Sequence, residues 1–97
     1  MIAVIAKVPV RPEKKDEALA AVKELMSRVA KEEGTLYYTL NIDKNQPDTL
    51  VFIELYKDME ALTAHGSTPH FQEFMKKALA FASGQPEIQV LKEIDSI

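Results

Sequence analysis

Hydrophobic and polar residues follow two different periods along the chain. Residues 2–10 are apolar and rich in β-branched side chains up to a break at Pro12, which predicts a strand. Residues 13–33 carry apolar side chains at helical spacing, with charged residues on the opposite side and Gly34 as the expected C-cap. The apolar positions of this predicted helix are Ala18, Val22, Leu25 and Val29.

The middle of the chain predicts two further strands. Residues 35–43 alternate, so that one face carries Leu36, Tyr38, Leu40 and Ile42, which we expect to pack under the helices. Residues 44–48 have the composition of a turn, and residues 49–57 form the next predicted strand.

The last third of the chain predicts two helices and a strand. Residues 58–65 have a short helical pattern that ends at Gly66. Ser67 or Thr68 is an expected N-cap for a second helix, with Pro69 in its first turn. The apolar positions of that helix are Phe71, Phe74, Met75, Ala78 and Ala82, and residues 87–95 read as the final strand.

The first and third strands are apolar on both faces, whereas the second and fourth alternate. Strands that are buried on both sides belong in the centre of a sheet. A βαββαβ chain with these central strands predicts an α+β, ferredoxin-like fold with an antiparallel sheet of order 4-1-3-2.

The helices of such a fold cover one face of the sheet. The other face would then carry Val51, Ile53 and Leu55, which together make an apolar patch. A second copy of the same sheet is the simplest cover, so we expect a homodimer, and a monomer with an exposed patch is the alternative.

Composition narrows the functional classes. The chain has 97 residues, which is one domain spanning residues 1–97, and a net charge of −3 without a basic cluster, so nucleic acid is not an expected partner. Cysteine and tryptophan are absent, and no glycine-rich phosphate loop is present. No apolar run is long enough to span a membrane, and the N-terminus does not resemble a signal peptide, so a cytoplasmic location is expected.

The two histidines, His65 and His70, flank the break between the predicted helices. His65 falls on the buried stripe of the short helix, and a neutral imidazole beside an apolar cavity is a candidate general base. His70 lies in the first turn of the next helix, where the helix dipole favours neutral imidazole. The alternative is that both residues are structural and hydrogen-bond the loop. Their spacing does not match a zinc-binding motif, so no metal is expected.

A carboxylate and several aromatic residues complete the candidate site. Glu54 lies on a central strand, where a carboxylate must be paired, hydrogen-bonded or protonated. It either forms an ion pair or hydrogen bond across the dimer, or is a cavity carboxylate that orients a histidine or binds substrate. Tyr38 faces the helices, and Phe71 and Met75 are core residues that are also placed to wall a cavity.

Two segments resemble the antibiotic biosynthesis monooxygenase family, which includes quinol monooxygenases. They are residues 52–71, FIELYKDMEALTAHGSTPHF, and residues 32–43, EEGTLYYTLNID. The resemblance implies a dimeric α+β barrel built from ferredoxin-like protomers. Some members oxygenate electron-rich phenols, anthrones or quinols with dioxygen and without a cofactor. Relatives degrade haem, typically with a tryptophan that this chain lacks, or isomerise a phosphorylated dione.

The resemblance implies a cofactor-independent monooxygenase that acts on a small quinol- or phenol-type substrate. His65 is then the base or substrate anchor, His70 its partner at the pocket mouth, and Glu54 the residue that orients a histidine. Tyr38 and Tyr56 contact the substrate. The alternatives are an isomerase of a small, phosphorylated dione and a non-catalytic small-molecule-binding domain.

Overall fold

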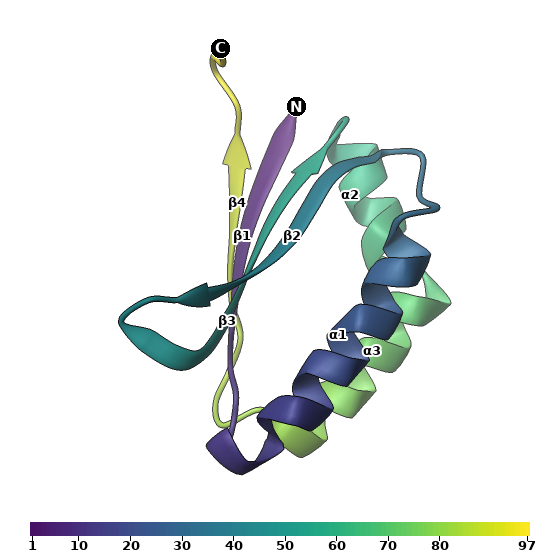
Figure 1. Cartoon of the computed structure of the whole chain (residues 1–97). Coiled ribbons are helices and arrows are strands. Elements are labelled where there is room, and N and C mark those ends of the chain that lie inside the picture. Colours follow the sequence, from purple (N-terminus) through teal and green to yellow (C-terminus); the bar gives the residue numbers. More distant parts are fainter.

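A computed structural model describes all residues, 1–97, as a four-stranded sheet with helices on one side (Figure 1). In chain order the elements are β1 (Ile2–Pro9), the 3-10 turn η1 (Pro12–Lys14), α1 (Lys15–Val29), β2 (Thr35–Asp43), β3 (Gln46–Tyr56), α2 (Met59–Gly66), α3 (Pro69–Phe81) and β4 (Glu87–Lys92). None of the helices combines the length and the apolar composition needed to cross a lipid bilayer.

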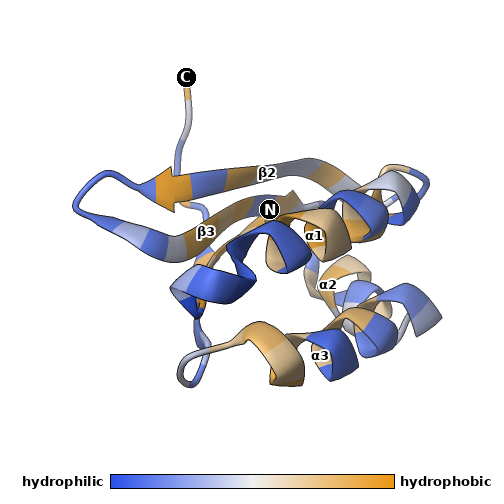
Figure 2. Ribbon diagram, turned by 60° about the horizontal axis from the view of Figure 1, so that its bottom comes forward, coloured by the Kyte–Doolittle hydropathy of each residue, from blue (hydrophilic) through white to orange (hydrophobic).

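The sheet has the order β2-β3-β1-β4, and all neighbouring strands are antiparallel. This confirms the predicted ferredoxin-like topology with the first and third strands in the centre. α1, α2 and α3 all lie on the same side of β2 and β3 (Figure 2). The sheet therefore has one face that the helices cover and one that they leave open.

The core lies between the helices and the inner face of the sheet. α1 buries Ala18, Val22, Leu25 and Val29, which are the four predicted positions. They pack with Leu50 and Phe52 of β3 and with Phe74, Ala78 and Phe81 of α3. The predicted inner face of β2 is correct only in its middle, because Tyr38 and Leu40 pack against the core while Leu36 and Ile42 are 47% and 46% exposed.

Three predicted boundaries were wrong for local reasons. α1 ends at Val29 with Ala30 as its C-cap, so Gly34 lies beyond the helix and is not a cap. The hairpin between β2 and β3 is tighter than predicted, because the Asp43 side chain accepts a hydrogen bond from the backbone of Asn45 and pairing resumes at Gln46. β4 ends at Lys92 instead of residue 95.

The outer face of the sheet carries an apolar patch and has no helix over it. Ile53 of β3 is 43% exposed, and its cross-strand neighbours on this face are Ile5 of β1 and Thr39 of β2. Tyr37 and Leu91, on the same face at either edge, are 52% and 37% exposed. Within one chain, this patch remains in contact with solvent.

Candidate functional site

The carboxylate of Glu32 joins the two histidines. Glu32 lies between α1 and β2, and its Oε1 and Oε2 atoms are 2.9 and 3.2 Å from Nδ1 of His65. Oε2 is 2.5 Å from Nε2 of His70, and the hydroxyl of Thr35 donates to Oε1 at 2.7 Å. The cluster of Glu32, Thr35, His65 and His70 is called the His–Glu–His cluster below. It unites two segments, residues 32–35 and 65–70, that are far apart in the sequence.

A close backbone approach brings Glu32 within reach of α2. A Cβ atom at Gly34 would lie 2.4 Å from the Cβ of Ala61, a distance at which one of the two segments would have to move. The carbonyl oxygen of Gly34 also accepts a hydrogen bond from the Lys57 backbone at 2.9 Å. Glycine at position 34 is therefore required for contact between the two segments, and not for a left-handed helix end, since no glycine has a positive φ.

The junction between α2 and α3 sets the positions of the histidines. Thr68 is the N-cap of α3, because its side chain accepts a hydrogen bond from the backbone of Phe71, and Pro69 follows at the first helical position. The Thr68 hydroxyl also donates to the carbonyl oxygen of His65 at 2.8 Å. One threonine thus ties the end of the first helix to the start of the second, and the predicted cap is confirmed.

The charge of Glu32 determines the tautomer of His65. Burial opposes ionisation of the Glu32 carboxyl, but the hydrogen bonds that it accepts outweigh burial and hold its pKa below the usual range of a glutamate. An ionised carboxylate accepts hydrogen bonds and cannot donate them, so Nδ1 of His65 carries the hydrogen. In neutral His65 the lone pair is then on Nε2, which is the arrangement that a general base requires.

Three aromatic rings surround the imidazole of His65. The ring centroids of Phe71, Tyr56 and Tyr38 lie 5.1, 5.4 and 5.6 Å from the imidazole centroid. His65 is only 4% exposed, which confirms that it lies on the buried side of α2. Burial raises the pKa of both tyrosines well above the usual range, so both remain neutral phenols. Three aromatic rings therefore pack around the imidazole, and a carboxylate holds its Nδ1 atom.

Glu54 interacts with a tyrosine and not with a histidine. Its Oε1 atom accepts a hydrogen bond from the hydroxyl of Tyr56 at 2.6 Å. Glu54 was predicted to orient a histidine, but it contacts neither one. Both histidines instead donate hydrogen bonds to the Glu32 carboxylate. Burial raises the pKa of the Glu54 carboxyl above its usual range, although the Tyr56 hydrogen bond opposes that change.

Three polar atoms in this region have no hydrogen-bond partner in the chain: Nε2 of His65, Oε2 of Glu54 and the hydroxyl oxygen of Tyr38. Every fully enclosed side-chain nitrogen or oxygen in the protein does have a partner. It follows that each of the three atoms reaches space that solvent can enter. Each of these atoms therefore retains unused hydrogen-bonding capacity.

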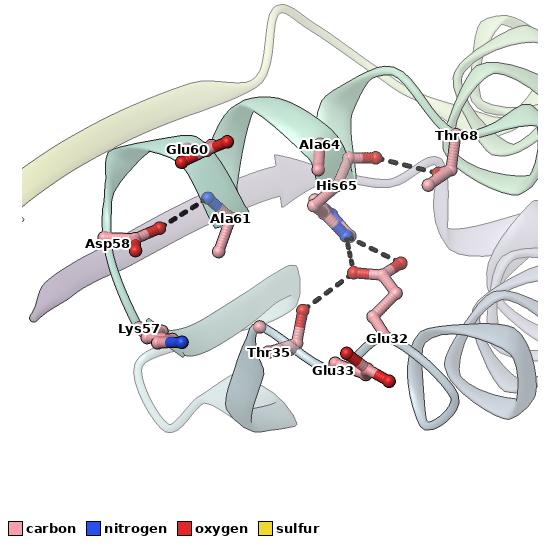
Figure 3. A pocket seen from close by; sticks show the side chains of 11 residues that line it. Glu32, Glu33, Thr35, Lys57, Asp58, Glu60, Ala61, Ala64, His65 and Thr68 are labelled. Atoms are coloured by element: carbon pink, nitrogen blue, oxygen red, sulfur yellow. Dashed lines mark hydrogen bonds and ion pairs between the residues drawn. The ribbon is translucent and has the colours of Figure 1, made fainter.

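A cleft of about 480 Å³ opens beside the cluster, between α2 and the segment that precedes β2 (Figure 3). Glu32 and His65 line it, together with charged residues that include Glu33, Lys57 and Glu60. The sequence predicted an apolar cavity next to His65. The cleft is instead lined mainly by polar side chains, and the aromatic rings around His65 are not among its lining residues.

The remaining candidates lie in different places. Tyr38 and Phe71 contact His65, and Tyr56 is fully buried beneath it with its hydroxyl on Glu54. Met75 is 37% exposed on α3 and takes part in none of these contacts. Glu32 was not among the predicted site residues, and its position before Gly34, in a segment quoted for the family resemblance, was the one signal that marked it.

The chain is similar in sequence to one protein family and to several named proteins. The family profile described as antibiotic biosynthesis monooxygenase matches residues 1–77. The Bacillus subtilis protein named "Putative monooxygenase YcnE" is 33% identical over 88 residues, which are 91% of this chain and 93% of that protein. An isomerase of (4S)-4-hydroxy-5-phosphonooxypentane-2,3-dione from Klebsiella pneumoniae is 29% identical over 73 residues, covering 75% of this chain and 74% of the isomerase.

A further relative and one solved structure extend this comparison. The Synechocystis protein sll1783 is 29% identical over 91 residues, and the chain spans 62% of its length. A crystal structure from Caulobacter crescentus, described as a "putative antibiotic biosynthesis monooxygenase", superimposes on this chain with a TM-score of 0.93 at 32% identity. The superposition covers 97% of this chain and 90% of that one.

Proposed function

The chain belongs to the antibiotic biosynthesis monooxygenase family, and we propose that it oxygenates a small, electron-rich quinol or phenol with dioxygen and without a cofactor. The observation that carries the proposal is the hydrogen bond from Nδ1 of His65 to Glu32, which leaves Nε2 free among three aromatic rings. A flat aromatic substrate is suited to such a surface because aromatic rings stack and pack edge to face.

The reaction requires a base at its first step. Nε2 of His65 takes the phenolic proton, and the imidazolium that forms is stabilised by the Glu32 carboxylate on the opposite nitrogen. The phenolate that results is a far better electron donor than the phenol and transfers an electron to dioxygen. For a hydroquinone the complete reaction is hydroquinone plus dioxygen to hydroxyquinone plus water, so the substrate is its own reductant.

The neighbouring residues have distinct roles in this proposal. Glu32 is a positioning residue that fixes the tautomer of His65, and His70 and Thr35 hold Glu32 by hydrogen bonds to its two oxygen atoms. Tyr38 and Phe71, whose rings adjoin the imidazole, are the residues that we assign to substrate contact. Tyr56 is fully buried, so its assigned role is to hold Glu54.

A homodimer is part of the proposal. The outer face of the sheet carries Ile53, Leu55 and Val51 of β3 next to Ile5 and Ala3 of β1, and no helix covers it. A second copy placed face to face would remove these side chains from water and is the cover that a symmetric dimer provides.

Isomerisation is the second candidate function. Its support is the Klebsiella relative, whose name is that of an isomerase. A base next to a carboxyl is also the pair of groups that moves a proton between neighbouring carbons of a ketone or dione. In that case Nε2 of His65 would remove a proton from carbon and no dioxygen would be consumed.

Oxygen uptake separates the candidates. The purified protein is mixed with a series of hydroquinones in an oxygen electrode, and the products are identified by mass spectrometry with ¹⁸O-labelled dioxygen. An oxygenase incorporates one labelled atom into the hydroxyquinone. An isomerase consumes no oxygen and exchanges substrate protons with D₂O under nitrogen. A binding domain does neither, but its melting temperature rises with ligand.

A further inference from the structure

Glu54 is a buried carboxyl group with one occupied and one available oxygen. Oε1 is held by the hydroxyl of Tyr56 at 2.6 Å, whereas Oε2 has no partner in the chain and reaches space that solvent can enter. The residue as a whole is only 6% exposed, and no lysine or arginine forms an ion pair with it. A carboxyl in this setting is held in one orientation and presents a single oxygen atom.

The surroundings of Glu54 favour its neutral form. Its cross-strand neighbours are Val4 on β1 and Tyr38 on β2, and neither compensates a negative charge as a cation would. The Glu32 carboxylate opposes ionisation of Glu54 through charge repulsion, and only His65 and the Tyr56 hydrogen bond favour it. Burial is the largest of these effects and raises the pKa of Glu54.

The pKa values of the two carboxyl groups of the site are therefore moved in opposite directions. Glu32 accepts three hydrogen-bond donors and is ionised, while Glu54 is buried with one donor. Two titratable groups whose environments move their pKa values apart are typical of an acid and a base that act in the same reaction. Glu32 holds the base His65, whereas Glu54 contacts neither histidine.

We propose that Glu54 is the proton donor of the reaction and delivers a proton from Oε2 to the oxygen atom that leaves as water. This inference rests on the proposed function, since that oxygen atom comes from dioxygen. After the phenolate and dioxygen combine, His65 returns its proton to the outer oxygen, and a ring carbon carries a hydroperoxide, H–C–O–O–H.

The next step breaks the O–O bond. His65 removes the proton of the ring carbon, the C–H electron pair forms the C=O bond, and the O–O electron pair leaves with the outer oxygen. The proton of Glu54 converts that oxygen into water. The proton on His65 then restores Glu54, so the enzyme returns to its starting state and the balance is hydroquinone plus dioxygen to hydroxyquinone plus water.

The substitution Glu54→Gln tests this role. The amide oxygen of glutamine still accepts the Tyr56 hydrogen bond, but glutamine has no proton to give. Glu13→Gln makes the same change at an exposed position of η1, outside the cluster and the cleft, and is the matched control. Without the proton donor we expect turnover to hydroxyquinone to fall by roughly 10²-fold, in line with the loss of a general acid.

The products and the pH profile provide readouts that a purely structural role would not change. In Glu54→Gln the stalled hydroperoxide should decompose, so that hydroquinone plus dioxygen gives quinone plus hydrogen peroxide. Turnover of the unchanged enzyme should decline at high pH as Glu54 loses its proton, and this decline should be absent from Glu54→Gln. Infrared spectroscopy of the unchanged protein at neutral pH should contain the C=O band of a protonated carboxyl group, and this band should disappear in Glu54→Gln.

The outcomes of these experiments separate the proposed role of Glu54 from the oxygenase proposal. Glu54→Gln with normal turnover, product ratio and pH profile overturns the role of Glu54 and leaves the oxygenase proposal intact. Absence of the infrared band in the unchanged protein overturns it as well, even where Glu54→Gln fails to fold. An unchanged enzyme that consumes no oxygen with any hydroquinone overturns the oxygenase proposal, and the role of Glu54 with it.

Discussion

Addition of one methyl group at Gly34 is expected to weaken both the fold and the site. The Cβ atom introduced by Gly34→Ala would lie 2.4 Å from the Cβ of Ala61, more than 1 Å inside the ~3.5–4.0 Å of ordinary carbon contacts. Overlap of this kind costs about 1–3 kcal/mol of the free energy of unfolding. The segment that carries Glu32 must then retreat from α2.

The same distances predict a rescue. Without the Cβ of Ala61, the nearest atom of that residue to the introduced methyl group is its Cα at 3.4 Å, which is ordinary contact. Ala61→Gly alone should cost about 0.5–1 kcal/mol, because glycine is unfavourable inside a helix. The double variant should therefore be more stable than the sum of the single changes predicts, by about 1–3 kcal/mol.

Urea unfolding of the four proteins measures this coupling as a double-mutant cycle. The site is followed in the same samples. A retreat of about 1 Å would take Glu32 from 2.9 Å to beyond hydrogen-bond distance of His65, and turnover in Gly34→Ala should fall by up to about 10²-fold and recover in the double variant. If the free energies are additive and turnover does not recover in the double variant, the close contact between Gly34 and Ala61 is refuted.

Three further predictions follow from the site and the sheet. Glu32→Gln should lower turnover by roughly 10²-fold, whereas Glu13→Gln, at an exposed position outside the cleft, should not. The pKa of Glu32 is lowered in the folded protein, so its contribution to stability is present above the usual glutamate pKa. This contribution is lost as the pH falls through the pKa of the folded state. In denaturant titrations at acidic pH, the stability of Glu32→Gln should therefore depend less on pH than that of the unchanged protein. Ile53→Asp should convert the proposed dimer into monomers in sedimentation velocity, because a charge would enter the proposed interface, and a monomeric unchanged protein would refute the dimer. His65→Ala should lower turnover per folded molecule by roughly 10²-fold at little cost in melting temperature, whereas Phe74→Ala should lose about 3–5 kcal/mol of stability.

The sequence was sufficient for the features that depend on local periodicity. The stripe of Ala18, Val22, Leu25 and Val29 repeats every three or four residues, so it could be read without knowledge of the rest of the fold. The apolar character of both faces of β1 and β3 likewise gave the strand order. These are properties of single elements.

The site depends on contacts that the sequence does not express. Glu32 follows a helix among other charged residues, and its pattern is that of a solvated loop. Only the approach of Gly34 to Ala61 brings its carboxylate to two histidines that are 33 and 38 residues away. Glu54 was recognised as an anomaly on its strand, but the expected intramolecular partner was a histidine, whereas the observed donor is Tyr56, two residues along the same strand.

The burial pattern of α2 separates the requirements of folding from those of specificity. Of the eight residues of this helix, His65 is the one that is fully buried, so the helix contributes no apolar side chain to the main core. Substitutions at its exposed positions, such as Glu60, Thr63 and Ala64, would therefore cost little stability. Glu60 and Ala64 also line the cleft beside the cluster. Changes in α2 would therefore alter the lining of this cleft at little cost to the fold, which the sheet, α1 and α3 maintain.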